Sequence, residues 1–311
     1  MTTWLIITRA VHFGTCLLFF GAFAFDCFTA PAFSGSQSDM ISYWRTRLRL
    51  FSLILLPLIL VSGAAWFALV AMTMSGQPIQ MDVLKIVWTQ TQFGTVWEIR
   101  LVIFVVALLT AVLFCFIKLP GGFQKAMAWF LLAVNGCLLG SLAWAGHGQE
   151  SSPWHLFADV LHLLAAGIWP AGLLPLFLLL RRSRRVTASA DWFSMAQLVR
   201  RFSAMSLAAV SLLAITGFVN SWFLVSSFSN LVGQPYGRWL LVKIIFFCAA
   251  LVIASVNLLR LKPRLLVESL RPETAKATVA QLQMNVQLEL FLGTVIIIVV
   301  AILGILPPAI H

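Results

Sequence analysis

The sequence predicts an all-α membrane protein, a bundle of eight transmembrane helices, and three observations lead to that class. Of the 311 residues, 61% are hydrophobic and 10% are charged, whereas a soluble domain is about half apolar and a quarter charged. The mean hydropathy is +0.97. Eight apolar stretches are long enough to cross a bilayer, and basic residues gather in alternate connections between them.

Each expected span is a run of about 20 mainly apolar residues. In chain order the spans cover approximately residues 4–30, 50–73, 97–117, 126–146, 155–180, 204–225, 238–260 and 282–306. The first begins near Met1 without a basic leader or a cleavage site, which indicates a retained helix. We therefore treat residues 1–311 as one integral membrane domain, with halves at about 1–146 and 147–311. No internal repeat is evident in the sequence.

The connections sort by charge. Alternate connections hold 16 of the 21 basic residues, and the remaining five are Arg9, Lys85, Arg100, Arg238 and Lys243. Lys and Arg accumulate on the cytoplasmic side, so both termini are expected outside, in the periplasm of a bacterium. The net charge of +11 then reflects topology and contact with lipid, and it implies no nucleic-acid partner.

Two connections are expected to be more than linkers. Residues 75–96 form the longest outer connection and are expected to re-enter the membrane or to lie along its surface. Residues 186–203 are basic and mixed in character, and they are expected to form an amphipathic cytoplasmic helix.

The strongest functional signal is a polar face on the fifth span. His155, Asp159 and His162 are spaced i, i+4, i+7, so one face of a helix carries all three. The residues after Asp159 are almost wholly apolar, and ionisable groups inside a membrane span usually mark a functional site. With the expected topology, all five histidines fall on the outer half of the protein.

These residues predict a metal centre in the outer half of the membrane. Imidazole is the commonest metal ligand in proteins, and soft metals such as Cu(I) also accept cysteine and methionine sulfur. Cys16 lies on the same helical stripe as His12. The expected ligands are His12, His147, His155, Asp159 and His162, with Cys16, Met72 and Met74 as secondary contacts.

Several short motifs occur in order along the chain. They include RAVHF at 9–13, TQFG at 91–94, GH at 146–147, DVLHLLAAGIW at 159–169, TG at 216–217, PYGRWLLVK at 235–243 and LGILPP at 303–308. Together they resemble the CopD family of bacterial inner-membrane copper-resistance proteins. Pro170 departs from the pattern of that family, and we expect it to kink the fifth span.

The resemblance implies copper transport or handling across the bacterial inner membrane, with movement from the periplasm to the cytoplasm, in support of copper resistance. It implies a periplasmic copper-binding partner of the CopC type and no enzymatic activity. It makes His12, His147 and His162 candidate copper ligands, with Asp159 at a matching position. The role of His155 rests on helical geometry alone.

Two other functions stay open on the sequence. A membrane redox protein would hold b-type haem, with His12 and His162 as axial ligands on separate helices. A scaffold for a periplasmic partner would use its histidines only at the interface, and their loss would leave copper accumulation unchanged.

Overall fold

The computed structural model describes residues 2–29, 39–117, 120–145, 152–184, 189–269 and 271–309. Within these ranges, eight helical segments are long and apolar enough to cross a membrane, which confirms the predicted class and the predicted order of spans. Several observed helices extend beyond the apolar windows, because their ends continue as polar, still helical turns.

The N half, residues 2–145, contains four spans and one short helix. Its elements are α1 (Thr2–Thr29), α2 (Asp39–Ser75), α3 (Met81–Gln90), α4 (Gln92–Phe116), α5 (Gly121–Gly140) and the 3-10 helix η2 (Ser141–Ala145). The spans are α1, α2, α4 and α5, and the short helix α3 joins α2 to α4. Helix α1 packs against α2 and α5, so it forms the centre of this half.

The C half, residues 152–309, has the same order of spans and short helix, with different connections between its helices. Its elements are α6 (Pro153–Ile168), α7 (Leu173–Ser183), α8 (Ser189–Val225), α9 (Phe228–Gly233), α10 (Pro235–Val256), the π-helix η4 (Asn257–Leu261), α11 (Lys262–Glu268) and α12 (Pro272–Leu303). Helices α6 and α7 together make the first span, and the short helix α9 joins the second span to the third. The order of two spans, a short helix and two spans therefore occurs twice in the described chain.

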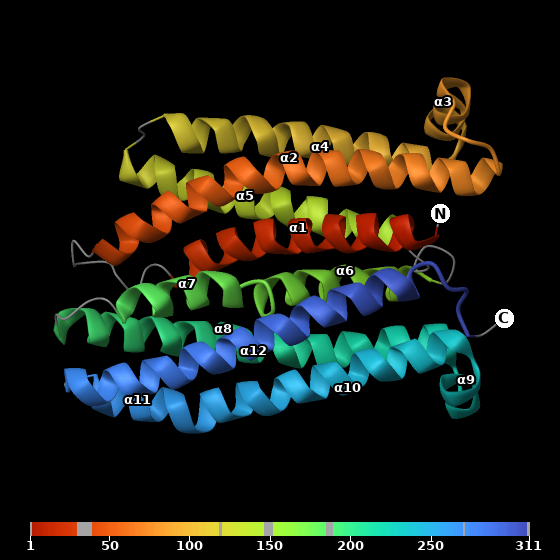
Figure 1. Cartoon of the computed structure of the whole chain (residues 1–311). Helices are drawn as coiled ribbons and strands as arrows, with labels where there is room; N and C mark the ends of the chain where they lie inside the picture. The colour runs from red at the N-terminus through yellow and green to blue at the C-terminus, as the bar shows by residue number, and fades with distance from the viewer. Residues whose placement is uncertain are drawn as a thin grey trace.

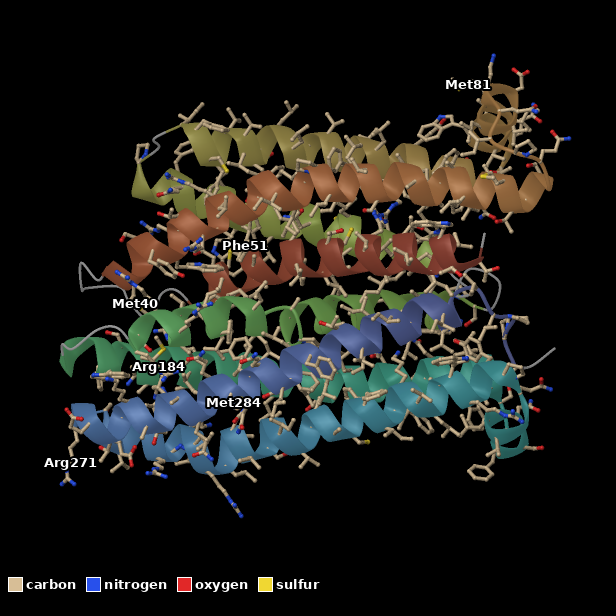
Figure 2. All side chains as sticks on the ribbon, viewed as in Figure 1. Met40, Phe51, Met81, Arg184, Arg271 and Met284 are labelled. Carbon is tan, nitrogen blue, oxygen red and sulfur yellow. The ribbon has the colours of Figure 1, made fainter. Side chains whose placement is uncertain are left out.

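The bundle has two distinct ends. Figure 1 shows both termini and both short helices, α3 and α9, at one end, which we call the terminal end. Figure 2 shows Arg184 and Arg271 at the opposite end from Met81 of α3. We call that opposite end the basic end. Successive spans run in opposite directions, and each half has four of them. The first and third spans of both halves therefore begin at the terminal end; these spans start with α1, α4, α6 and α10.

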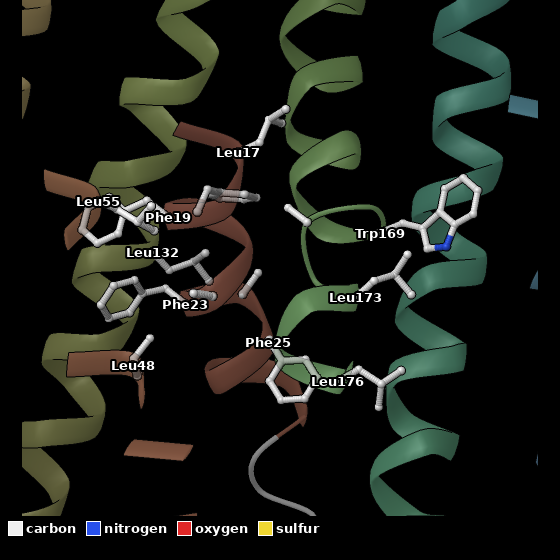
Figure 3. Close-up of a cluster of buried hydrophobic side chains, with 14 of the residues drawn as sticks. Leu17, Phe19, Phe23, Phe25, Leu48, Leu55, Leu132, Trp169, Leu173 and Leu176 are labelled. Carbon is white, nitrogen blue, oxygen red and sulfur yellow. The ribbon is translucent and has the colours of Figure 1, made fainter. Parts of the chain in front are cut away.

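The two halves meet where α1 crosses α6. A methyl group on Gly21 would lie 2.6 Å from the carbonyl oxygen of Gly167, so these two backbones touch. Around this crossing, Phe19 and Phe23 of α1 pack into the N half, and Figure 3 shows Trp169 and Leu173 at the break between α6 and α7. Small residues thus bring the first spans of both halves into close contact.

The outside of the bundle is apolar, as lipid contact requires. Large hydrophobic side chains with more than 60% exposure occur on several spans, among them Val61, Val102, Ile215, Phe218, Trp222 and Leu259. The buried polar residues of the interior include His12, Ser62, Arg100, His155 and Glu289. In a membrane this inside-out distribution places the ionisable groups within the protein and away from lipid.

The structure settles the expectations about local features. The expected kink at Pro170 is confirmed, because α6 ends at Ile168 and α7 begins at Leu173. Residues 189–203 are helical, as expected for this segment, but they form the first turns of α8 and bury Trp192 and Phe202 in the bundle. The connection at 75–96 contains α3, which lies at the end of the bundle and does not re-enter it (Figure 1).

Candidate functional site

His12 is buried on α1, at 1% exposure, between α2 and α4. Its Nδ1 lies 3.1 Å from Ser62 Oγ, and its Nε2 lies 2.7 Å from Arg100 Nη2. A guanidinium group can only donate, so Nε2 accepts and the ring proton must be on Nδ1, where it is donated to Ser62. Ser62 in turn donates to the carbonyl oxygen of Leu58. The imidazole is therefore neutral, and its metal-ligating lone pair points at a cation.

Arg100 is held by more than the histidine. Its Nη1 donates to the carbonyl oxygen of Leu138 at 3.0 Å and to Ser141 Oγ at 2.6 Å. These acceptors lie where α5 passes into η2, so one buried side chain joins α1, α4 and α5. Such a charge-assisted network stabilises the packing of the N half.

A thiol and two indole rings complete this site. Cys16, one turn after His12, places its Sγ 3.8 Å from His12 Nε2. The rings of Trp66 and Trp97 lie 5.5 and 5.7 Å from the imidazole, centroid to centroid. We call His12, Cys16, Ser62 and Arg100 the N-half centre. It is closed off from solvent, because all four side chains are buried.

His162 on α6 has the same kind of surroundings in the C half. Its Nδ1 lies 3.0 Å from Thr216 Oγ1 on α8, and its Nε2 lies 3.4 Å from Lys243 Nζ on α10. An ammonium group only donates, so the ring proton is again on Nδ1. The hydroxyl of Thr216 donates a hydrogen bond to the carbonyl oxygen of Leu212 at 2.6 Å. His162 and Lys243 are only partly buried, unlike their N-half counterparts.

Asp159 lies one turn before His162 on the same helix face. Its Oδ1 accepts a hydrogen bond from Asn220 Nδ2 at 3.2 Å, and its carboxylate interacts electrostatically with Lys243. His155, a further turn away, stacks on the ring of Phe223 with a centroid separation of 5.0 Å. All three residues of the predicted polar face thus meet α8 or α10. We call Asp159, His162, Thr216 and Lys243 the C-half centre.

The two centres occupy equivalent positions. Each Nδ1 bonds a hydroxyl residue that is followed directly by glycine, Ser62-Gly63 in one half and Thr216-Gly217 in the other. A methyl group on Gly63 would lie 3.1 Å from His12 Cε1, and one on Gly217 would lie 3.4 Å from His162 Cε1. In both halves the glycine lets the imidazole lie directly against the neighbouring helix.

The two cations are positioned by equivalent joints. Arg100 and Lys243 are each the ninth residue of their helix, and each follows a glycine, Gly94 or Gly237, by six residues. A methyl group on either glycine would overlap backbone carbonyl oxygens of the short helix before it, α3 or α9. The glycines therefore allow α4 and α10 to start against those short helices, which fixes the register of the cation.

The ligand chemistry differs at the fourth residue after each histidine. Cys16 has this position in the N half, and Ala166 has it in the C half. The thiol beside His12 thus has no counterpart beside His162. The N-half centre offers a soft ligand, and soft ligands favour Cu(I).

The third residue before each histidine differs in charge. Arg9 in the N half stacks on Trp66, with its guanidinium carbon 4.9 Å from the ring centroid. Asp159 in the C half bonds Asn220, which stands four residues after its hydroxyl residue, as Trp66 does after Ser62. The C-half centre therefore offers an oxygen ligand where the N half has a second cation.

Comparison with known sequences identifies the chain. A family model described as "Copper resistance protein D-like, N-terminal domain" matches residues 1–156, and one described as "Copper resistance protein D" matches residues 196–303. The first of these covers half of the sequence. The chain belongs to the copper resistance protein D family. This confirms the family expected from the motifs, and with it an association with copper resistance and copper transport.

Relatives of known name agree with this family. The chain is 29% identical to copper resistance protein D of Pseudomonas syringae pv. tomato over 97% of its own length and 96% of that protein. It is 26% identical to the inner membrane protein YebZ of Escherichia coli, over 98% of both chains. It is also 29% identical to the copper transport protein CutJ of Bacillus subtilis, over 59% of this chain and 34% of that protein.

Within the described part of the chain, the expected copper ligands His12 and His162 do not meet at one point. Both ring nitrogens of His12 and both of His162 bond partners within their own half. His147 lies outside the described residues. Among the residues that are described, no group of three or more His, Cys, Asp or Glu side chains is close enough to hold one metal ion. The histidines form two separate centres instead.

The haem alternative, like copper binding, needs the ring nitrogens that face the two cations. An axial ligand needs a free Nε2, and two of them must face one iron. Arg100 occupies Nε2 of His12, and Lys243 occupies Nε2 of His162. Met72 and Met74, expected as secondary contacts, lie in the last turn of α2 and form no described contact with either centre.

The partners of the two histidines were not assigned a role from the sequence. They are Ser62, Thr216, Arg100 and Lys243. The signal for the two cations was nonetheless present, because each is an ionisable residue well inside an apolar span. What the sequence does not give is which histidine each cation faces, since that depends on how helices distant in the chain pack together.

Proposed function

We propose that this protein carries copper across the bacterial inner membrane, from the periplasm to the cytoplasm, in support of copper homeostasis and resistance. The observation that carries the proposal is the pair of neutral imidazoles inside the protein, each with its Nε2 lone pair directed into the bundle. Imidazole nitrogen is a good copper ligand, and the family relationship names the metal. In this proposal the protein is a transporter and catalyses no chemical reaction.

The N-half centre offers a pair of ligands suited to Cu(I). Bonds from a metal to imidazole nitrogen and to thiolate sulfur are roughly 2.0 and 2.3 Å long, so two ligands of one ion stand roughly 3.5–4.3 Å apart. The separation of 3.8 Å between Cys16 Sγ and His12 Nε2 falls in that range. In the C half, His162 provides a nitrogen ligand, and the carboxylate of Asp159 lies on the same helix face.

The distribution of charge supports the direction. Basic residues gather at the basic end of the bundle. They include Arg181 and Arg182 in the last turn of α7, Arg184 just after it, and Lys262 and Arg264 on α11. That end is therefore cytoplasmic by the positive-inside rule, and the terminal end is periplasmic. Both centres then lie nearer the periplasm, and the membrane potential favours inward movement of a cation by about 2.3 kcal/mol per charge per 100 mV.

The terminal end is also where a soluble copper donor would dock. The short helices α3 and α9 both lie there, with exposed apolar side chains such as Met81 and Phe228. A periplasmic copper-binding protein of the CopC type is the partner that this proposal expects.

Uptake of copper by purified protein in liposomes tests the proposal. We expect His12→Ala and His162→Ala each to lower the initial uptake rate at least ten-fold, because each removes a ligand. Cys248→Ala is the matched control, since this cysteine is exposed on α10 and belongs to neither centre. Unchanged uptake in both histidine variants would support the scaffold function instead, and a Soret band in the purified protein would support the haem function.

Thiol labelling tests the orientation separately. Gln77→Cys lies between α2 and α3 at the terminal end, and Arg271→Cys lies just before α12 at the basic end. A membrane-impermeant maleimide added to cells with a permeabilised outer membrane should label the first variant and not the second. The reverse result would place the histidine centres near the cytoplasm and contradict the inward direction.

A further inference from the structure

A cation occupies the metal-ligating nitrogen in both halves. Arg100 donates to Nε2 of His12, and Lys243 donates to Nε2 of His162. A metal ion needs the same lone pair, and it is repelled by a positive charge at that distance. Copper therefore cannot bind Nε2 of either histidine until the side-chain cation has moved away.

Hydrogen bonding alone does not require a cation at these places. A neutral amide would satisfy the same nitrogen, whereas a charge inside a membrane protein carries a large desolvation cost. Among the described residues, the ion pair with a nitrogen–oxygen distance within 4.0 Å is Arg264 with Glu268. No carboxylate oxygen in this part of the chain lies that close to the charged nitrogens of Arg100 or Lys243. Each cation thus places a positive charge close to where a bound copper ion would carry one.

The two cations differ in how firmly they are held. Arg100 keeps two acceptors, Leu138 O and Ser141 Oγ, after its bond to His12 is broken. Lys243 has one hydrogen-bond acceptor in the described part of the chain, His162 Nε2 at the long distance of 3.4 Å. The ammonium group of Lys243 is also carried on a flexible four-carbon chain. The carboxylate of Asp159, one turn before His162 on α6, interacts electrostatically with this ammonium group and favours its charged form.

We propose that Lys243 is a tethered competitor cation, which occupies His162 when copper is absent and moves toward Asp159 when copper binds. The positive charge beside His162 Nε2 then changes little, because the copper ion takes the place of the ammonium group and Asp159 pairs with the displaced lysine. Competition keeps copper binding weak enough for release, which a transport site needs. At the N-half centre Arg100 must also leave Nε2 of His12 before copper binds there, and its bonds to Leu138 O and Ser141 Oγ oppose that movement more strongly. This inference rests on the proposed function, because it assumes that copper reaches His162.

Silver ion, a redox-inert substitute for Cu(I), tests this competition by calorimetric titration of the purified full-length protein. Lys243→Gln keeps a hydrogen-bond donor and removes the charge, so we expect it to raise silver affinity at the C-half centre at least ten-fold. Lys243→Arg keeps the charge and should bind silver within about three-fold of the unmodified protein. Thermal unfolding without silver checks that both variants are folded, and both should unfold close to the unmodified protein.

Two outcomes separate this inference from the proposed function. Unchanged or weaker silver binding in Lys243→Gln, alongside a clear loss in His162→Ala, would overturn the competitor role and make Lys243 a structural donor. Unchanged silver binding in His162→Ala would remove copper from this centre and overturn the proposed function at that site. If Lys243→Arg and Lys243→Gln bind silver equally tightly, charge is not the cause and the inference also fails.

Discussion

The N half and the C half of this protein hold a histidine in the same way and surround it with different chemistry. In each half a hydroxyl group fixes Nδ1, a glycine makes room for the ring, and a cation reaches Nε2 from the third span. The neighbouring positions differ, with Cys16 and Arg9 in one half and Ala166 and Asp159 in the other. A repeated scaffold has thus kept the orientation of an imidazole while its possible ligand partners changed.

The halves also differ in how tightly the histidine is enclosed. His12 and Arg100 are 1% and 2% exposed, and Arg100 joins three helices through its hydrogen bonds. His162 and Lys243 are partly buried and share one long hydrogen bond. The comparison indicates that the cation of the N-half centre is held rigidly, whereas the cation of the C-half centre can exchange its position more easily. Four sets of variants test it.

The largest difference is expected on removal of the two cations. Arg100→Met removes hydrogen bonds to three acceptors, and each bond to a charged group contributes about 1.5–3 kcal/mol. We expect a loss of about 3–5 kcal/mol in the free energy of unfolding. Lys243→Met removes a single long bond and should cost about 1 kcal/mol or less. Unfolding in mixed micelles measures both, and equal losses would contradict a difference in rigidity.

The joints before the third spans should respond alike. Gly94→Ala and Gly237→Ala each press a methyl group against backbone carbonyls of the preceding short helix, and overpacking of this kind costs about 1–3 kcal/mol. Gly121→Ala at the start of α5 is the control, because a methyl group there meets nothing within 4 Å. A loss in one half without a similar loss in the other would show that the two joints are not equivalent.

The difference in ligands should appear in silver affinity. Cys16→Ser removes the soft ligand beside His12, and we expect affinity at the N-half centre to fall on the order of ten-fold, about 1.4 kcal/mol. Ala166→Cys adds a thiol at the equivalent position and should raise affinity at the C-half centre. Cys248→Ser is the control and should change neither value. If Cys16→Ser behaves like this control, the thiol beside His12 is packing material.

The smallest effects are expected at the two hydroxyl groups. Ser62→Ala and Thr216→Val each remove the acceptor for a histidine Nδ1–H, and hydrogen bonds between helices in membranes average about 0.6 kcal/mol. We expect losses of about 0.5–1.5 kcal/mol in the free energy of unfolding. Ser221→Ala removes a hydroxyl that bonds only its own helix, at Gly217 O, and should cost less. Losses below that of Ser221→Ala would mean that the hydroxyls do not anchor the rings.

Much of the fold follows directly from the sequence, because a membrane span needs a long apolar run and little else. The break at Pro170 also followed, since proline lacks the N–H that would continue the helix. Residues 189–203 were expected to be helical, but their continuity with the next span was not predicted. A mixed polar and apolar pattern is typical of a surface helix and also of a helix end that buries residues such as Trp192 and Phe202 in the bundle.

The repeat was not visible in the sequence because it has no fixed period. His12 and His162 are 150 residues apart, Ser62 and Thr216 are 154 apart, and Arg100 and Lys243 are 143 apart. Insertions at the helix break and in the connections shift each pair by a different amount. Only the packing of helices brings the equivalent side chains to equivalent places.

The candidate site was predictable in part for a similar reason. Helical spacing alone placed His155, Asp159 and His162 on one face, and this holds in the structure. Spacing within a helix says nothing of the partner across the interface, so the two cations were not assigned and His12 was expected to join the other histidines. The number of centres is a property of tertiary packing.

The interruption between α6 and α7 has a mechanical meaning. In the N half, α1 is one continuous 28-residue rod that links the terminal end to the basic end past His12. In the C half the corresponding rod is cut between Ile168 and Leu173, and α7 packs mainly on α12 while α6 packs mainly on α8. A displacement at the basic end is therefore transmitted to His12 along one continuous helix. It reaches His162 only across the less rigid break between α7 and α6.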